Sequence, residues 1–315
     1  MVRFTTVVLL AAMFSACRPA PPDDPAPAEA VISLMGDTLV PPPMSTDTRA
    51  RLKGNLAEAQ ERYTVDPSDL DNIIWFGRRL AYLWRYQDAI DVYSAGLERY
   101  PDEPRLLRHR GHRLITVRRF EESERDLARA ADLVDGTEDR IEEDGQPNEL
   151  GIPLSTLHTN IHYHLGLAQY LQGNFEDAAA SFGRCREMAG NDDMRVAAAD
   201  WEYMSLRRAN RHNEAEGAIG FVTPALNMIE NHAYHRRILM YHGYLSADSL
   251  MQTPAGEDAA LTLATQGYGV ANWYLAEGDT SRAQQLFERV LDTGYWAAFG
   301  YIAAEADLAR LVSAR

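Results

Sequence analysis

The sequence predicts an all-α fold, a superhelical array of about six helical hairpins with a capping helix at each end. Two observations predict it. From residue 70 onward, small and large apolar residues recur with a period of 34 residues. In addition, 46% of the residues are hydrophobic and 24% are charged, which is typical of a folded soluble body.

The period is clearest between residues 70–103 and 104–137, in which Gly77 and Gly111 are equivalent. Small residues at such positions let the two helices of a hairpin approach closely, and larger residues beside them, such as Tyr93, fill the remaining space. One hairpin cannot bury its apolar face alone, so neighbouring hairpins must stack.

The other units keep this spacing less strictly. The third is clear, the fourth is weaker, the fifth has diverged and the sixth recovers the pattern. They span residues 159–192, 196–229, 230–263 and 264–297, and capping helices are expected at 46–63 and 298–312. Ser45 or Thr46 is suited to N-cap the first capping helix.

These spacings resemble the tetratricopeptide repeat, and the resemblance covers about three quarters of the chain. It implies a right-handed superhelix in which the first helix of each hairpin lines a concave groove. In that family the groove binds extended peptides or partner helices. The resemblance therefore implies a protein-binding scaffold with no catalytic residues and no cofactor.

Residues 1–17 predict an export signal. A basic start is followed by the apolar run Phe4–Phe14 and by the small residues Ser15 and Ala16. The end of this segment resembles the lipobox of bacterial lipoproteins. That resemblance implies that Cys17 is lipidated and anchors the chain to an envelope membrane. Ordinary signal cleavage is the alternative.

Residues 18–44 hold eight of the fifteen prolines, which disfavour regular secondary structure and predict a semi-extended tether. Arg18 directly follows Cys17. In well-studied lipoproteins an Asp at that place favours retention in the inner membrane, so the resemblance implies sorting to the outer membrane.

One segment breaks the period. Gly111 and Gly166 are 55 residues apart, which is one period of 34 plus 21 extra residues at about 134–155. Residues 134–150 contain seven acids and one base, with Gly and Pro between them. The composition predicts a solvated acidic loop on one edge of the array.

The formal net charge is −15, which argues against a nucleic-acid partner because phosphate binding needs a basic surface. His158, His162 and His164 could collect a zinc ion, but two of them point to different helix faces and no acid lies at ligand spacing. Residues 135–139 alternate as in a calcium loop, but Arg140 stands where such a loop needs Gly. We predict no metal site.

Helical spacing within the repeats places one set of side chains on the inner face. It is rich in arginine and tyrosine, which are enriched in interaction hot spots. These candidate partner-binding residues are Arg78, Tyr82, Arg105, Arg108, His112, Asn160, Tyr163, Arg207 and Arg208. The alternative is that the arginines only pair with Asp and Glu on neighbouring helices.

The sequence therefore predicts a non-catalytic scaffold, anchored at a bacterial envelope membrane, that binds another protein or a peptide through its concave groove. Two alternatives stay open. The chain could be a fixed structural subunit of an envelope assembly or secretion complex. It could also hold an enzyme or small-molecule site in the diverged residues 230–263.

Overall fold

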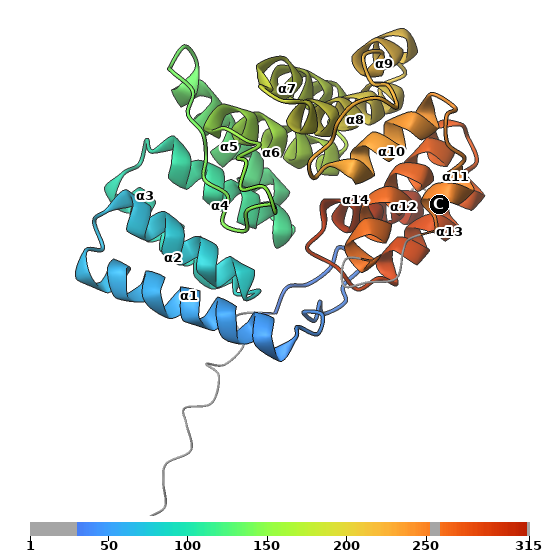
Figure 1. Ribbon diagram of the computed structural model, residues 1–315. Coiled ribbons are helices and arrows are strands. Elements are labelled where there is room, and N and C mark those ends of the chain that lie inside the picture. The colour runs from blue at the N-terminus through green and yellow to red at the C-terminus, as the bar shows by residue number, and fades with distance from the viewer. Residues whose placement is uncertain (1–29, 253–258, 314–315) are drawn as a thin grey trace, which may run out of the picture.

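The computed structural model describes residues 30–252 and 259–313, and its helices form an arched array (Figure 1). The helices are α1 (Thr46–Val65), α2 (Leu70–Tyr82), α3 (Tyr86–Arg99), α4 (Pro104–Thr116), α5 (Phe120–Val134), α6 (Leu157–Gln172), α7 (Phe175–Met188), α8 (Asp192–Arg208), α9 (His212–Ile219), α10 (His232–Tyr241), α11 (Ala247–Leu250), α12 (Ala259–Ala276), α13 (Thr280–Leu291) and α14 (Phe299–Ser313). Within these two ranges, β-structure is limited to two isolated bridges.

The predicted all-α array of six hairpins with two capping helices is confirmed. The hairpins are α2–α3, α4–α5, α6–α7, α8–α9, α10–α11 and α12–α13, and the caps are α1 and α14. The fifth hairpin, in the diverged unit, is incomplete because α11 has only four residues. Ser45 caps α1, and its side chain accepts a hydrogen bond from the amide of Thr48.

The repeated small residues lie where two helices of a hairpin touch. A Cβ atom added to Gly77 would lie 2.4 Å from the ring of Tyr93, and one added to Gly111 would lie 2.6 Å from Leu127. Glycine at these positions lets α2 contact α3 and α4 contact α5 closely. The 34-residue period therefore records the packing of each hairpin.

The array curls until its last helices reach its first half. α14 packs against α12 and α13 and also contacts α6. Arg118, in the turn after α4, forms an ion pair with Glu305 of α14 at 2.6 Å and donates to the carbonyl of Trp296 at 3.0 Å. Trp84, in the turn after α2, packs on the ring of Trp296 with the centroids 5.0 Å apart. Both turn residues have positive φ, 64° and 66°, where glycine is usual, and both make contacts that glycine could not make.

Residues 30–44, the described part of the predicted tether, fold back onto the array. Val31 and Leu39 pack against the hydrophobic core, and the amide of Leu34 donates to the carboxylate of Glu305. The tether prediction is therefore wrong for these residues, because Val31 and Leu39, which lie between the prolines, pack against the core of the array.

The predicted signal and Cys17 lie outside the described residues, so their assignment stays a prediction. In the part of the chain that the structure describes, no helix combines the length and the apolar character needed to cross a membrane.

Candidate binding groove

The concave side of α2, α4 and α6 borders a cavity of about 370 Å³, which α8, α10 and the start of α14 close. The structure brings six of the predicted groove residues together around this cavity. They are Arg78, Tyr82, Arg108, His112, Asn160 and Tyr163. Which of these residues touch a partner stays a prediction.

The cavity continues at both ends. A pocket of about 260 Å³ shares Arg78 and His109 with it, and there the predicted residue Arg105 pairs with Asp71. At the other end, a cavity of about 740 Å³ shares Arg113 with it and extends to α1. The three cavities therefore follow one another as one groove.

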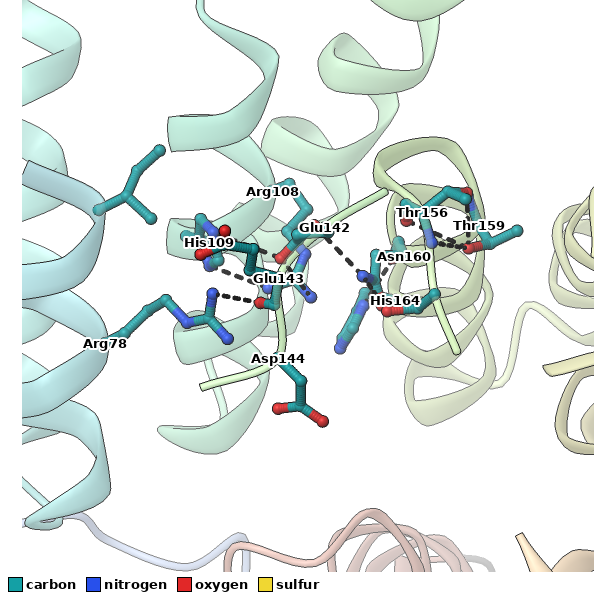
Figure 2. Close-up of polar contacts among 12 residues, drawn as sticks. Arg78, Arg108, His109, Glu142, Glu143, Asp144, Thr156, Thr159, Asn160 and His164 are labelled. Atoms are coloured by element: carbon teal, nitrogen blue, oxygen red, sulfur yellow. Dashed lines mark hydrogen bonds and ion pairs between the residues drawn. The ribbon is translucent and has the colours of Figure 1, made fainter. Parts of the chain in front are cut away.

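Of the acidic insertion, residues 135–156, the segment 140–145 lies in this groove, so the prediction that the insertion lies on the edge of the array is wrong for that segment (Figure 2). Arg78 of α2 donates from Nη1 to the carbonyl of Glu143 at 2.8 Å, and Arg79 donates from Nη1 to the carbonyl of Gly145 at 3.1 Å. The composition showed a solvated loop, but it could not show that a face of opposite charge attracts it.

Backbone pairing directs the insertion into the groove. An antiparallel bridge joins Ile141 to Thr156, and the amide of Leu157 donates to the carbonyl of Arg140 at 2.9 Å. Thr156 also caps α6 through reciprocal hydrogen bonds with Thr159. The start of α6 therefore fixes where residues 140–145 cross the array.

The carboxylate of Glu142 is bound by side chains of two helices. Oε1 lies 3.1 Å from Nη2 of Arg108 and 3.4 Å from Nε2 of His109, both on α4. Oε2 accepts a hydrogen bond from Nδ2 of Asn160 on α6 at 3.2 Å. The side chain of Glu142 is only 14% exposed. These residues form a carboxylate site, here filled by the chain itself.

The contacts of His109 assign its proton. Nη1 of Arg108 lies 2.9 Å from Nδ1 of His109, and a guanidinium group can only donate. Nδ1 is therefore the acceptor, and the proton is on Nε2, which faces Glu142. Both side chains thus offer a donor to the same carboxylate oxygen.

Aromatic side chains form a further part of the cavity wall. The rings of His112 and His164 lie 4.2 Å apart, and Phe299 lies 5.4 Å from His112. Tyr163 donates through its hydroxyl to that of Tyr234 at 3.1 Å. This wall offers flat apolar surface together with hydroxyl and ring nitrogen groups.

Burial lowers the pKa of His109, His112 and His164 well below the ordinary histidine value, and neighbouring arginines lower it further. These histidines are therefore neutral at neutral pH. Arginines carry the positive charge of the groove. Among them, Arg113 has no acidic partner within the described ranges and lies over the ring of Tyr86 at 5.6 Å.

Arg207 and Arg208 do not line the three cavities, and their contact with a partner stays a prediction. Arg207 pairs with Glu277 at the end of α12 at 2.7 Å, and Arg208 pairs with Asp307 of α14 at 2.9 Å. The helix register gave the correct face of α8. However, the curl of the array brings α12 and α14 onto that face, so these arginines hold helices together, as the alternative prediction expected.

The diverged residues 230–263 contribute a layer of the array. α10 packs against α8 and α12, and Arg237 of α10 pairs with Asp200 of α8 at 2.8 Å, both fully buried. Across residues 30–252 and 259–313, no three His, Cys, Asp or Glu side chains are arranged to hold a metal ion.

The groove residues that sequence reasoning did not select include His109, Arg113, His164 and Tyr234. Three of them directly follow a selected residue on the same helix, so a wider arc of each inner face would have included them. Tyr234 lies in the diverged unit, where the repeat offered no register from which to place it.

Comparison with protein-family models found no match, and neither did comparison with curated proteins. Solved structures do resemble this chain. YrrB, described as a TPR protein with an unusual peptide-binding site, is 14% identical, with 75% of this chain and 91% of that chain covered and a TM-score of 0.42. MamA is 12% identical, with 65% and 100% covered and a TM-score of 0.42. A tetratricopeptide repeat protein from Parabacteroides merdae is 14% identical, with 81% and 93% covered and a TM-score of 0.49.

At these identities the likeness concerns the fold alone. The hairpins of this chain identify the repeat without these comparisons. α2 and α4 begin 34 residues apart, at Leu70 and Pro104, and they pack through equivalent glycines. The described residues therefore form a helical repeat array with the 34-residue period that is typical of the tetratricopeptide repeat.

Proposed function

We propose that this protein binds an extended segment of another protein along the concave face of α2, α4 and α6, while its N-terminus is anchored by lipid to a bacterial envelope membrane. The observation that supports binding is the groove, whose three cavities share lining residues. Its arginine, tyrosine and histidine side chains match the composition of interaction hot spots. The rigid array acts by shape and side-chain recognition, without covalent chemistry.

Site-specific photocrosslinking in cells tests the binding face. A photoreactive amino acid is placed at Tyr82 or Tyr234 in the groove, and at the exposed Arg129 or Arg184 on the outer helices α5 and α7. We expect one protein to be crosslinked from both groove positions and from neither outer position. Crosslinks from the outer positions alone contradict the proposal and favour a structural subunit held by its convex face.

The anchoring proposal rests on the lipobox resemblance at Cys17, since several acyl chains on one residue hold a protein stably at a membrane. We expect a Cys17→Ser chain to leave the membrane fraction and to lose metabolic labelling with palmitate. A Cys17→Ser chain that stays in the membrane fraction contradicts lipid anchoring. Separation of inner and outer membranes then tests the proposed outer-membrane sorting.

A further inference from the structure

We infer that residues 140–145 of the insertion occupy the groove as an intramolecular ligand, and that the partner is an acidic, extended protein segment that replaces them. This inference rests on the proposed function, because it names what the groove recognises. The contacts of the insertion are the evidence, since they show which chemistry the groove already accommodates.

The groove binds this segment partly through its backbone. Arg78 and Arg79 donate to the carbonyl oxygens of Glu143 and Gly145, two residues apart. Alternate carbonyl groups of an extended chain point to the same side. Backbone contacts do not depend on the side chains of the ligand, so another extended segment can make the same two hydrogen bonds.

Two positions add selectivity. Glu142 occupies the site formed by Arg108, His109 and Asn160, and hydrogen bonds to a charged acceptor are among the strong ones. Three residues later, a Cβ atom on Gly145 would lie 2.0 Å from the hydroxyl of Tyr82. The groove therefore favours an acidic residue followed, three positions later, by a glycine.

The insertion leaves part of the groove unused. The cavity of about 370 Å³ remains beside it, and Arg113 faces this space without an acidic partner in the described ranges. Nε of Arg108 is buried and has no hydrogen-bond partner there. A partner with a second acidic residue can pair with Arg113, which the insertion does not reach, and can thereby bind more strongly than the insertion.

The insertion is also able to leave. Ile141 is 64% exposed, and Glu143 and Asp144 are exposed, so release uncovers little apolar surface. A tethered segment competes at an effective concentration on the order of millimolar. Removing it should strengthen binding of a free acidic peptide by at least about tenfold.

The test uses a fluorescent peptide with the sequence of residues 138–147 and a second peptide in which Glu142 is replaced by Gln. Anisotropy titrations compare the full-length chain with a variant whose residues 138–153 are exchanged for a Gly/Ser linker of equal length. We expect the linker variant to bind the acidic peptide at least about tenfold more tightly than the wild type. We expect the Gln peptide to bind the linker variant about tenfold more weakly than the acidic peptide, and Arg108→Gln in the linker variant to abolish this difference.

The full-length Glu142→Gln chain covers the case in which the linker variant does not fold. Its circular dichroism should match that of the wild type, and its affinity for the acidic peptide should be higher. Equal affinities of the wild type and the variants overturn the inference. Equal binding of the acidic and Gln peptides also overturns it, although a groove for extended segments would remain. Crosslinking from Tyr82 and Tyr234 judges the proposed function independently of both results.

Discussion

The two halves of the array use their concave arginines differently. In α8–α14, Arg208 pairs with Asp307 and Arg237 pairs with Asp200. Both aspartates lie on helices, and their side chains are at most 1% exposed. In α2–α7, by contrast, Arg78 and Arg108 contact a loop, which binds them through one backbone carbonyl and one side chain. The arginines are alike, but the elements that cover them are not.

The physical reason for this difference is the amount of apolar surface that each covering element buries. α14 buries apolar side chains such as Ile302 and Leu308 against its neighbours, so it cannot leave without exposing the core. The insertion buries few, as exposed Ile141 and Leu150 show. Arginines on an inner face therefore indicate a binding surface only where their cover can be displaced.

Replacing Asp307 with Ala should have the largest effect on stability, because it removes the carboxylate that fixes α14 to α8. Asp307 accepts hydrogen bonds from Arg208 at 2.9 Å, Arg310 at 2.8 Å and Tyr268 at 3.0 Å. Burial raises the pKa of Asp307, but the two arginines lower it more, so the pKa stays below its ordinary value. We expect a loss of about 3–5 kcal/mol in unfolding free energy, measured by urea denaturation, because Arg208 is left buried and unpaired. A loss below about 1 kcal/mol would contradict a fixed α14.

Two glycines that touch arginines offer a matched pair. A Cβ atom on Gly269 of α12 would lie 2.1 Å from Nε of the fully buried Arg237, whereas one on Gly145 would meet Tyr82 and Arg78 at the groove. We expect Gly269→Ala to cost about 1–3 kcal/mol by overpacking, although Ala favours a helix. Gly145→Ala should cost less than about 0.5 kcal/mol and should raise hydrogen exchange of residues 140–145. Equal costs would remove the distinction between the halves.

The buried histidines of the first half should make the stability of the protein depend on pH between pH 7 and 5.5. Below about pH 6.5 the unfolded chain takes up protons that neutral His109, His112 and His164 in the folded chain do not bind. The unfolding free energy therefore decreases as the pH is lowered. Each contributes up to about 1.4 kcal/mol per pH unit. We expect His164→Gln to reduce the slope between pH 7 and 5.5, whereas His212→Gln, at an exposed position on α9, serves as the control. An unchanged slope in His164→Gln contradicts a neutral buried histidine.

Glu142→Gln should have a much smaller effect on stability than Asp307→Ala. The insertion can move into water when its charge is removed, so we expect a loss of about 1 kcal/mol or less in thermal unfolding. A loss as large as that of Asp307→Ala would mean that the insertion is as firmly built in as α14. The distinction between a displaceable and a fixed cover would then fail.

Features of this protein that depend on neighbours within one repeat could be predicted from the amino-acid sequence. Gly77 and Tyr93 predicted how α2 and α3 touch, and the inner-face register predicted that Arg108 and Tyr163 border one groove. The break between Gly111 and Gly166 also predicted the insertion. Such features follow from helical period and residue size, which are local properties.

The extent of the curl and the elements that cover the inner face could not be predicted from the repeats. Small rotations between successive repeats add up along the chain, and no single repeat records their sum. That sum brings Arg118 within reach of Glu305, 187 residues later, and brings α14 onto Arg208. It also leaves an inner surface of arginines on α2 and α4 for the acidic insertion to bind. A repeat period specifies each hairpin, but it does not specify these distant contacts, because they depend on the shape of the whole array.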